Sequence, residues 1–305
     1  MSSLRRYAEE YLTIRRALGF KLVGEGYLLA SFVTFVEQNG VGIITTELTV
    51  TWTRLAIDAG PVYLAKRMRA VRPFARYLHT IDPKNEVPPV DLFPCQKYRP
   101  TPHIYTDDEI VALMSAAREL APPLRAATLE TIIGLLAATG MRIGEALALD
   151  CSDVDSDEGL LTVRNSKYGK SREVLLHPST VEALKRYANQ RDQLTRPWDP
   201  SFFVWIRGTR PKYRRVLQAF SELRSRVFAE DTSYQPRIHD LRHTFAVNTL
   251  LSWYRDGGDV ASRTPLLSTY LGHVDPAATY WYLSAVPELL GLAAQRLELV
   301  LEGQS

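Results

Sequence analysis

Four short motifs between residues 139 and 282 hold the side chains whose types and spacing could do chemistry. They are Thr139-Gly140-Met141-Arg142-Ile143-Gly144-Glu145, Ser166-Lys167-Tyr168-Gly169-Lys170, His239-Asp240-Leu241-Arg242-His243, and Leu271-Gly272-His273 followed nine residues later by Tyr282. Taken singly, each has an ordinary structural explanation: Arg142 and Glu145 could be a surface pair on a helix, and Tyr282 could be a core aromatic. Taken together, they offer cations for an anion, imidazoles for proton transfer and a phenol as nucleophile.

His239 and His243 also suggest a metal site, because two histidines four residues apart on a helix are typical of zinc hydrolases. The residue after His239 is Asp240 rather than glutamate, however, and Arg242 lies between the histidines. A guanidinium beside a dication is electrostatically unfavourable. We therefore expect neither a metal site nor a cofactor.

In this order and spacing, the four motifs resemble the tyrosine recombinase (phage integrase) family. The shared signals are T-G-M-R-I-x-E, a hairpin lysine, H-x-L-R-H and L-G-H followed by a tyrosine, and they cover about residues 128–290. The resemblance implies a metal-free DNA strand transferase, a site-specific recombinase that breaks and rejoins DNA. Residues 280–287 are similar to integrases carried by transposable elements, which implies integration or transposition of a mobile element.

The resemblance implies that Tyr282 attacks a phosphodiester to form a 3′-phosphotyrosine and leave a 5′-hydroxyl. Arg142 and Arg242 would hold the non-bridging oxygens, because planar guanidiniums match them in pairs and stay charged. Glu145 would support Arg142 and take no part in the chemistry. Tyr280 is a competing nucleophile, but the offset of Tyr282 from the L-G-H motif is the family's usual one.

The remaining roles concern protons. Lys167 would protonate the departing 5′-oxygen, His239 would assist proton transfer, and His273 would hydrogen-bond the phosphate. Lys170 could replace Lys167, which matches the first lysine of the family's hairpin. The connection over residues 253–264 is longer than in most family members, and could be an extra loop that contacts DNA or a neighbouring subunit.

Apolar periodicity predicts a mainly α-helical chain with a small β-hairpin or sheet. We expect four helices near residues 4–18, 27–37, 46–60 and 61–79, with Thr46 capping the third. Prolines between residues 83 and 102 indicate a linker over 91–105. A capping box formed by Thr106 and Glu109 then opens a second segment, with a hairpin at 160–164 and 172–176. The resemblance implies that residues 1–90 form a helical core-binding (SAM-like) DNA-binding bundle and 106–305 the catalytic domain.

Basic residues indicate where DNA would bind. Residues 1–100 carry 14 basic and 9 acidic side chains, a net charge of +5, although the whole chain carries only +3. Arg69, Arg72 and Arg76 share one face of the fourth helix, where they could meet successive phosphates, or could be merely solvated. The full set of candidate DNA contacts is Lys66, Arg67, Arg69, Arg72 and Arg76 in the first segment and Arg207, Arg210, Lys212, Arg214 and Arg215 in the second.

The C-terminal residues suggest how copies of the chain would associate. Pro287 opens a final helix with an apolar face over Leu289–Leu301, which could fold back on its own domain. In the family the corresponding helix often docks into a neighbouring protomer. We therefore expect a homotetramer on paired sites of double-stranded DNA, joined through this helix and open to companion recombinases.

The amino-acid composition excludes several classes of protein. With 46% hydrophobic and 23% charged residues the chain is not disordered, and its two cysteines form no CxxC pair, which disfavours a disulfide scaffold. There is no secretory signal or long apolar run, so we expect a cytoplasmic protein without a membrane partner. A topoisomerase-like enzyme and a DNA-binding regulator without turnover stay open, and the sequence does not specify the target site or the direction of reaction.

Overall fold

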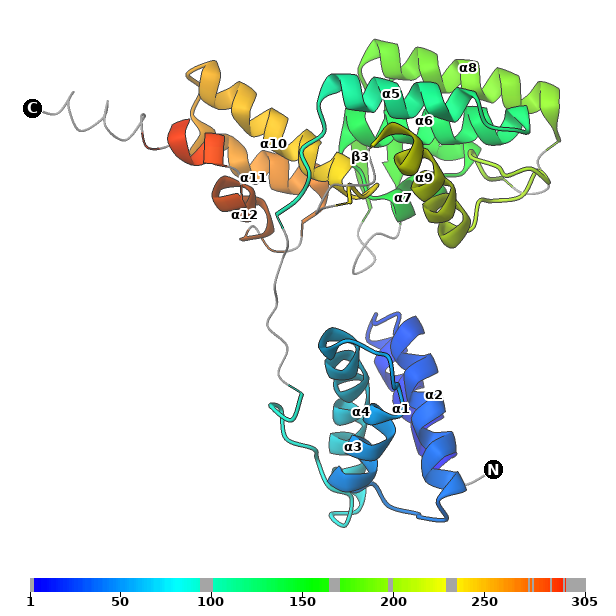
Figure 1. The fold of residues 1–305 in the computed structure, drawn as a ribbon, viewed down its shortest axis with the longest axis vertical. Coiled ribbons are helices and arrows are strands. Elements are labelled where there is room, and N and C mark those ends of the chain that lie inside the picture. The colour runs from blue at the N-terminus through cyan, green and yellow to red at the C-terminus, as the bar shows by residue number, and fades with distance from the viewer. Residues whose placement is uncertain are drawn as a thin grey trace, which may run out of the picture. The chain divides into compact units, whose positions relative to one another are not determined.

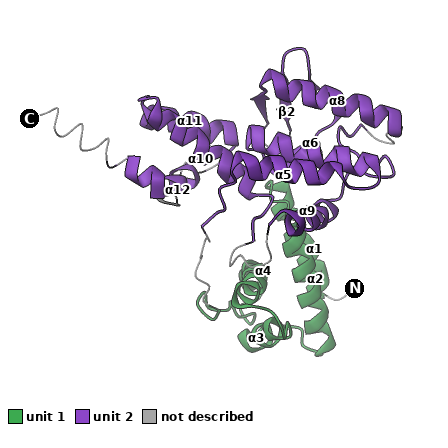
Figure 2. Cartoon of the chain, turned by 45° about the horizontal axis from the view of Figure 1, so that its top comes forward, with its two compact units in different colours: residues 1–99 green, residues 100–305 purple. Residues whose placement is uncertain are grey.

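A computed structural model describes residues 3–93, 101–164, 171–196, 200–228, 235–273, 275, 277–285, 287–292 and 294 (Figure 1). The chain divides into two compact units, residues 1–99 and 100–305 (Figure 2). Helices dominate both units, and one three-stranded antiparallel sheet lies in the second. The predicted fold class, mainly α with a small β element, is confirmed. No helix among the described residues is long and apolar enough to cross a membrane.

Residues 3–93, the described part of unit 1, form four helices, α1 (Ser3–Ala17), α2 (Val23–Gln38), α3 (Thr46–Arg54) and α4 (Pro61–Ile81). Val71, Phe74 and Leu78 bury the predicted apolar face of α4 in a core that includes Phe32 and Trp52. Burial of this apolar face holds α4 in place. The opposite, exposed face of the helix can therefore be strongly basic.

Both boundaries of α3 differ from the prediction. Thr45, rather than Thr46, caps α3, because its Oγ1 accepts a hydrogen bond from the Leu48 amide. The helix ends at Arg54 and not near Gly60. The Trp52 carbonyl near its end is instead taken by the guanidinium of Arg67, which donates from Nη2 at 2.6 Å and lies over the Trp52 ring.

The prediction that Arg67 contacts DNA is therefore wrong. Its side chain is buried, and a cation at the carboxyl end of α3 interacts favourably with the free carbonyls there. Arg72 is half-buried and donates from Nε to the Pro88 carbonyl, which holds the segment after α4 against that helix. Lys66, Arg69 and Arg76 remain exposed on α4.

Unit 2 opens with α5 (Asp107–Arg118), whose predicted capping box is present because Thr106 and Glu109 exchange hydrogen bonds. The helix α6 (Pro123–Thr139) lies between α5 and α8 (Pro178–Leu194) and also contacts α10 (Asp240–Arg255) (Figure 1). Its buried residues occur on all sides, as expected for a helix surrounded by protein. The helix α9 (Tyr213–Val227) covers α5.

The sheet follows the short helices α7 (Ile143–Ala148) and η1 (Cys151–Asp153). Its strands are β1 (Val154–Asp155), β2 (Leu160–Val163) and β3 (Arg172–Leu175), and Leu161 faces Val174 across the predicted hairpin. Leu161, Val163 and Val174 are buried, so the predicted single buried face is confirmed. The hairpin turn, residues 165–170, lies outside the described residues.

The helices α10, α11 (Val260–Leu271) and α12 (Ala277–Ala285) form a second apolar cluster (Figure 1). The extra loop expected over residues 253–264 is wrong, because α10 continues to Arg255 and Asp259 already caps α11 by accepting from the Ser262 amide. Only residues 256–259 of this stretch lie outside helices.

The tail also begins differently from the prediction. Leu289 is fully buried in the cluster of α10–α12, and Glu288 pairs with Arg255 of α10. Packing in trans is therefore wrong for Leu289, because this side chain fills the core of its own unit, whereas Leu290 is exposed. Residues 295–305, which include most of the predicted apolar face, lie outside the described residues.

Candidate active site

Three arginines from distant parts of the chain meet at the carboxyl end of α11. Arg142 donates from Nη2 to the Gly272 carbonyl at 3.0 Å, Arg242 donates from Nη2 to the Leu271 carbonyl at 2.8 Å, and Arg172 donates from Nε to the Tyr270 carbonyl at 2.8 Å. The last carbonyls of a helix lack partners within it and carry the negative end of its dipole. The end of α11 therefore holds and partly compensates the three cations.

Two glycines of the motifs make this meeting possible. Gly140 ends α6 with φ +60°, and its carbonyl accepts a hydrogen bond from Arg242 Nη1 at 2.8 Å. A Cβ at Gly140 would overlap the Phe245 ring, and a Cβ at Gly272, where φ is +67°, would lie 2.8 Å from Arg172 Nη1. Both positions therefore require glycine for their left-handed backbone and for the close approach of a side chain.

Glu145 is the carboxylate that joins two of the arginines. It accepts from Arg142 Nη1 at 2.8 Å and from Arg172 Nη1 and Nη2 at 3.1 and 2.8 Å. Burial alone would raise the pKa of Glu145, but hydrogen bonds from Arg172 and Arg142 outweigh it and lower the pKa to about 2. Arg142 and Glu145 thus form the expected pair, within a larger network.

Arg172 is the residue of this network that the sequence analysis missed. It opens β3, and its side chain lies on the same face as the buried Val174, two residues along the strand. An arginine on the inward face of a strand signals an internal partner. The bidentate pair with Glu145 joins the first residue of β3 to the start of α7, beside Arg142.

Arg242 is the most enclosed of the three cations. Its side chain is buried, and burial, followed by the positive charge of Arg142, lowers its pKa to about 10. It still carries its charge at neutral pH. A buried permanent cation held by the Gly140 and Leu271 carbonyls is suited to bind an anion, because these hydrogen bonds fix its position and the low dielectric around it strengthens its attraction for negative charge.

Tyr282 lies between two imidazole rings. Its hydroxyl is 3.1 Å from His243 Nδ1, and its ring stacks on that of His273 with the centroids 6.3 Å apart. His273 Nδ1 is also 2.7 Å from the Thr279 hydroxyl of α12. Tyr282 is only 2% exposed, whereas Tyr280 is 48% exposed. The sequence analysis did not predict this contact between His243 and Tyr282.

The three imidazoles are held in their neutral form. Burial, together with nearby charges, lowers the pKa of His243 and of His273 to about 4, and it also lowers the pKa of His239. The neighbouring cation for His239 and His273 is Arg242. His239 meets His243 edge-on, with the ring centroids 4.9 Å apart. Neutral imidazoles can accept as well as donate a hydrogen bond, so this group can relay protons.

The predicted Lys167 and its alternative Lys170 lie outside the described residues. The strands that carry their turn end at Val163 and begin again at Arg172.

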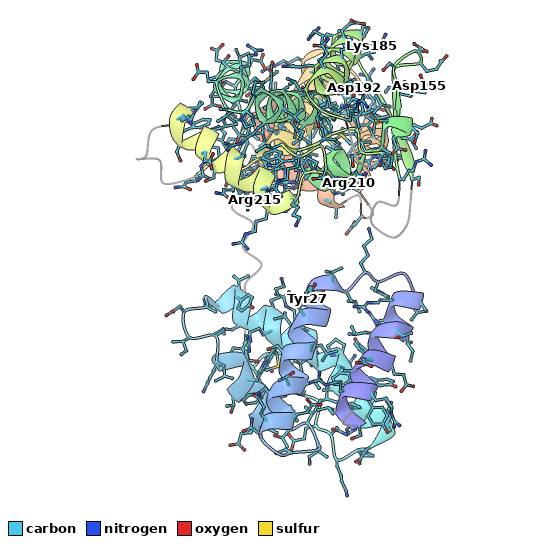
Figure 3. The ribbon with its side chains drawn as sticks, turned by 90° about the vertical axis from the view of Figure 1, so that its right-hand side faces the viewer. Tyr27, Asp155, Lys185, Asp192, Arg210 and Arg215 are labelled. Carbon is cyan, nitrogen blue, oxygen red and sulfur yellow. The ribbon has the colours of Figure 1, made fainter. Side chains whose placement is uncertain are left out.

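The second basic run contains another correction. Arg210 donates from Nη1 to the Leu147 and Leu149 carbonyls at 2.7 and 3.2 Å and pairs with Asp150, so its guanidinium fixes the end of α7. Figure 3 labels it together with Arg215, in the first turn of α9. The members of this run that remain exposed are Arg207, Lys212, Arg214 and Arg215.

The chain is similar to known proteins along most of unit 2 and beyond it. The family model described as Phage integrase family matches residues 104–288. The putative integrase/recombinase y4rB of Sinorhizobium fredii is 40% identical over 98% of either chain, and tyrosine recombinase XerD of Brucella melitensis is 28% identical over 83% of this chain and 84% of its own.

Solved structures with a similar fold cover almost the whole chain. XerA recombinase matches with a TM-score of 0.52 and 26% identity over 96% of either chain. The Tn1549 transposon integrase, in complex with transposon right end DNA, matches with a TM-score of 0.68 and 15% identity over 98% of this chain and 99% of its own.

Replacing Glu145 should weaken unit 2 and change its acid sensitivity. Glu145→Gln leaves buried guanidiniums without their carboxylate, and we expect it to lower the free energy of unfolding at pH 7 by about 3 kcal/mol. Because the pKa of Glu145 is lower in the folded chain, its contribution is complete above about pH 4.5 and is lost as the pH falls toward 2. The gap between wild type and variant should therefore close over that range in urea titrations followed by circular dichroism. Glu158→Gln, at an exposed turn position, is the matched control and should follow wild type. A gap that is absent at pH 7, or that stays constant down to pH 2, would contradict the assigned network.

Proposed function

The chain belongs to the phage integrase family, and from this premise we propose that it is a site-specific tyrosine recombinase that cuts and rejoins DNA through a 3′-phosphotyrosine. The observation that carries the proposal is the meeting of Arg142 and Arg242 at the end of α11, in the same part of the unit as Tyr282. Two permanent cations and a phenol are the groups that a phosphodiester transesterification without a metal needs.

The arginines can bind a phosphate without leaving their carbonyls. Each Nη nitrogen of a guanidinium carries two N–H groups, so one hydrogen bond to Leu271 or Gly272 leaves another donor free for an oxygen of the phosphate. Charge that develops on the non-bridging oxygens during attack would meet cations that are already in place. Such stabilisation costs no rearrangement at the moment of reaction.

The proton steps follow from the same arrangement. Tyr282 Oη would form a bond to phosphorus while the bond to the 5′-oxygen breaks. His239, neutral because of its lowered pKa, would help to remove the phenol proton, and Lys167 would donate a proton to the departing 5′-oxygen. His273 would hydrogen-bond the phosphate. Rejoining is the reverse reaction, in which the 5′-hydroxyl attacks the phosphotyrosine.

A mobile element is the proposed substrate. The 40% identical relative is described as a putative integrase/recombinase, and the Tn1549 integrase is a transposon protein. These descriptions, together with residues 280–287, support integration or transposition.

Trapping the covalent intermediate tests the proposed chemistry. A nicked DNA duplex that carries an end of the element loses its short 5′-hydroxyl fragment after cleavage, so the adduct cannot be resealed. Wild type and Tyr280→Phe should give a denaturant-resistant protein–DNA adduct in EDTA. Tyr282→Phe should give none, since it lacks the attacking oxygen.

The controls separate the alternatives. An adduct that survives Tyr282→Phe and disappears in Tyr280→Phe would assign the nucleophile to Tyr280. If wild type binds a cognate end and forms no adduct, the DNA-binding regulator is favoured. Relaxation of supercoiled DNA without joining of paired sites would favour a topoisomerase.

We propose that DNA contacts the exposed basic residues of both units. On α4 these are Lys66, Arg69 and Arg76, joined by the half-buried Arg72, and before and within α9 they are Arg207, Lys212, Arg214 and Arg215. The solved structures of the Tn1549 integrase and of lambda integrase are complexes with DNA, which supports the proposal.

The double variant Arg69→Ala/Arg76→Ala should weaken DNA binding through lost phosphate contacts. The slope of log K against log salt should fall in magnitude by about 2, since each phosphate contact contributes about 0.9. Fluorescence anisotropy at several salt concentrations measures this slope. Arg5→Ala, which removes a guanidinium already paired with Glu37, is the matched control and should keep the slope. An unchanged slope in the double variant would exclude this face of α4 from the DNA interface.

We propose that the tail beyond Ala294 joins protomers into a tetramer on paired DNA sites. Residues before that point include Leu289, which fills its own core, so truncation after Ala294 leaves that contact intact. The truncated chain should bind a single site with wild-type affinity but should lose the slow-migrating paired-site complex in native gels. Normal assembly of the truncated chain on paired sites would refute the trans contact.

A further inference from the structure

We propose that Tyr105 is a positioning residue of the active site, which holds the turn that carries His239 through two hydrogen bonds. One of these bonds comes from the Tyr105 hydroxyl and the other from its backbone amide. The inference rests on the proposed function, because it is there that His239 takes part in proton transfer. It adds a residue far away in the sequence that sets where this histidine lies.

Tyr105 is firmly held at the start of unit 2. It ends the segment that the sequence predicted as a linker, yet its side chain is 2% exposed and belongs to the core of the unit. Its ring meets the rings of His103 and Phe228 edge-on, with the centroids 4.7 and 6.1 Å apart, and the next residue, Thr106, caps α5. Because both its ring and its backbone are fixed, Tyr105 can fix another segment in turn.

The two hydrogen bonds reach both ends of the turn that opens α10. The Tyr105 hydroxyl donates to the Arg237 carbonyl at 3.1 Å, and the Tyr105 amide donates to the Thr244 hydroxyl oxygen at 2.9 Å. Thr244 in turn donates from this hydroxyl to the Asp240 carbonyl at 3.0 Å. One residue therefore contacts the chain before α10 and the helix itself, and the predicted proton-transfer histidine lies between the two contacts.

Asp240 closes the turn between these contacts. Its carboxylate accepts from the Arg237 amide and from Arg237 Nη2, each at 2.8 Å, and its amide donates back to the Arg237 carbonyl at 2.9 Å. His239 directly precedes Asp240, and its carbonyl accepts from the Arg242 amide at 3.2 Å. The Arg237 carbonyl is thus where the Tyr105 hydroxyl reaches this ring of hydrogen bonds. A shift of that carbonyl would displace His239, and a proton-transfer group acts only within hydrogen-bond reach of its partner.

The electrostatic surroundings of His239 report its position. Partial burial, followed by the positive charge of Arg242, lowers its pKa. The charged and titratable groups that face it are Asp240, Arg242 and His243 from α10, Arg237 just before α10, and Arg142 just before α7. If the turn loosens, the ring gains water and distance from Arg242, so the pKa of His239 should rise.

Tyr105→Phe removes the hydroxyl and keeps the ring, so it tests the contact with Arg237. In NMR titrations of the DNA-free protein with labelled histidine, the pKa of His239 should be higher in this variant than in wild type. The His239 signal is identified by its loss in His239→Gln. Tyr187→Phe is the matched control, because it removes an equally buried hydroxyl, which accepts from the Val204 amide at 3.0 Å. It should lower stability but leave the pKa of His239 unchanged.

Single-turnover cleavage of the nicked DNA, at saturating protein, adds a second measurement. Tyr105→Phe should form the covalent adduct about 10-fold more slowly than wild type, since a displaced base loses part of the roughly 10²–10⁴-fold that such a group contributes. The rate should also begin to fall at a higher pH on the acid side, because protonated His239 cannot accept the phenol proton. The affinity for DNA should not change, because the exposed basic residues of both units stay in place. Tyr187→Phe should cleave at the wild-type rate.

An unchanged pKa of His239 in a folded Tyr105→Phe would overturn the proposal. An equal loss of rate in Tyr187→Phe would also overturn it, because the effect would then be one of stability. Thermal unfolding shows whether Tyr105→Phe is folded. If it is not, Thr244→Val and Thr244→Ser decide, because serine keeps the hydroxyl that accepts from the Tyr105 amide and valine removes it. The pKa of His239 must then be higher in the valine variant, and equal values overturn the proposal.

The titration distinguishes this proposal from the proposed function. It needs no DNA, so its result stands whether or not the protein cleaves. A failure of the proposed function would show instead as an absent adduct in wild type.

Discussion

The organisation of unit 2 depends on one electrostatic constraint, the presence of three guanidiniums at one helix end. Like charges this close repel each other, and burial removes the water that would screen them. Two sources of negative potential resolve the conflict, the free carbonyls of residues 270–272 and the carboxylate of Glu145. The low pKa of Glu145 and the lowered pKa of Arg242 are two consequences of the same balance.

This constraint explains why segments far apart in the sequence have to meet. Arg142 enters from the start of α7, Arg172 from β3 and Arg242 from α10, and each ends on the carbonyls of α11. Gly140 and Gly272 supply the backbone turns and the space that the side chains need. The helices and the small sheet must therefore be arranged so that all three arginines reach the carboxyl end of α11. An error in any of these elements would leave a buried cation without its partner.

The parts that were predictable from sequence are those that depend on local pattern. Periodicity identified the buried face of α4 and the hairpin, and hydrogen-bonding residues identified the capping box at Thr106. Charge counting failed where a cation has its hydrogen-bond partners inside its own unit. Arg67 and Arg210 lie within basic runs, yet each caps the end of a helix inside its unit. The contact of His243 with Tyr282 joins residues 39 positions apart, which no local pattern records.

The site combines fixed cations with an enclosed nucleophile, and these two properties answer different demands. Fixed cations lower the barrier because no reorganisation is needed when charge develops on the phosphate. A nucleophile fixed in the same way would face any phosphodiester that reached the arginines. Tyr282 instead lies on a separate short helix, enclosed between His243 and His273, so the nucleophile and the arginines belong to different elements. Bringing the two elements together around one phosphate would draw on binding energy from the whole DNA interface, which then contributes to the choice of site.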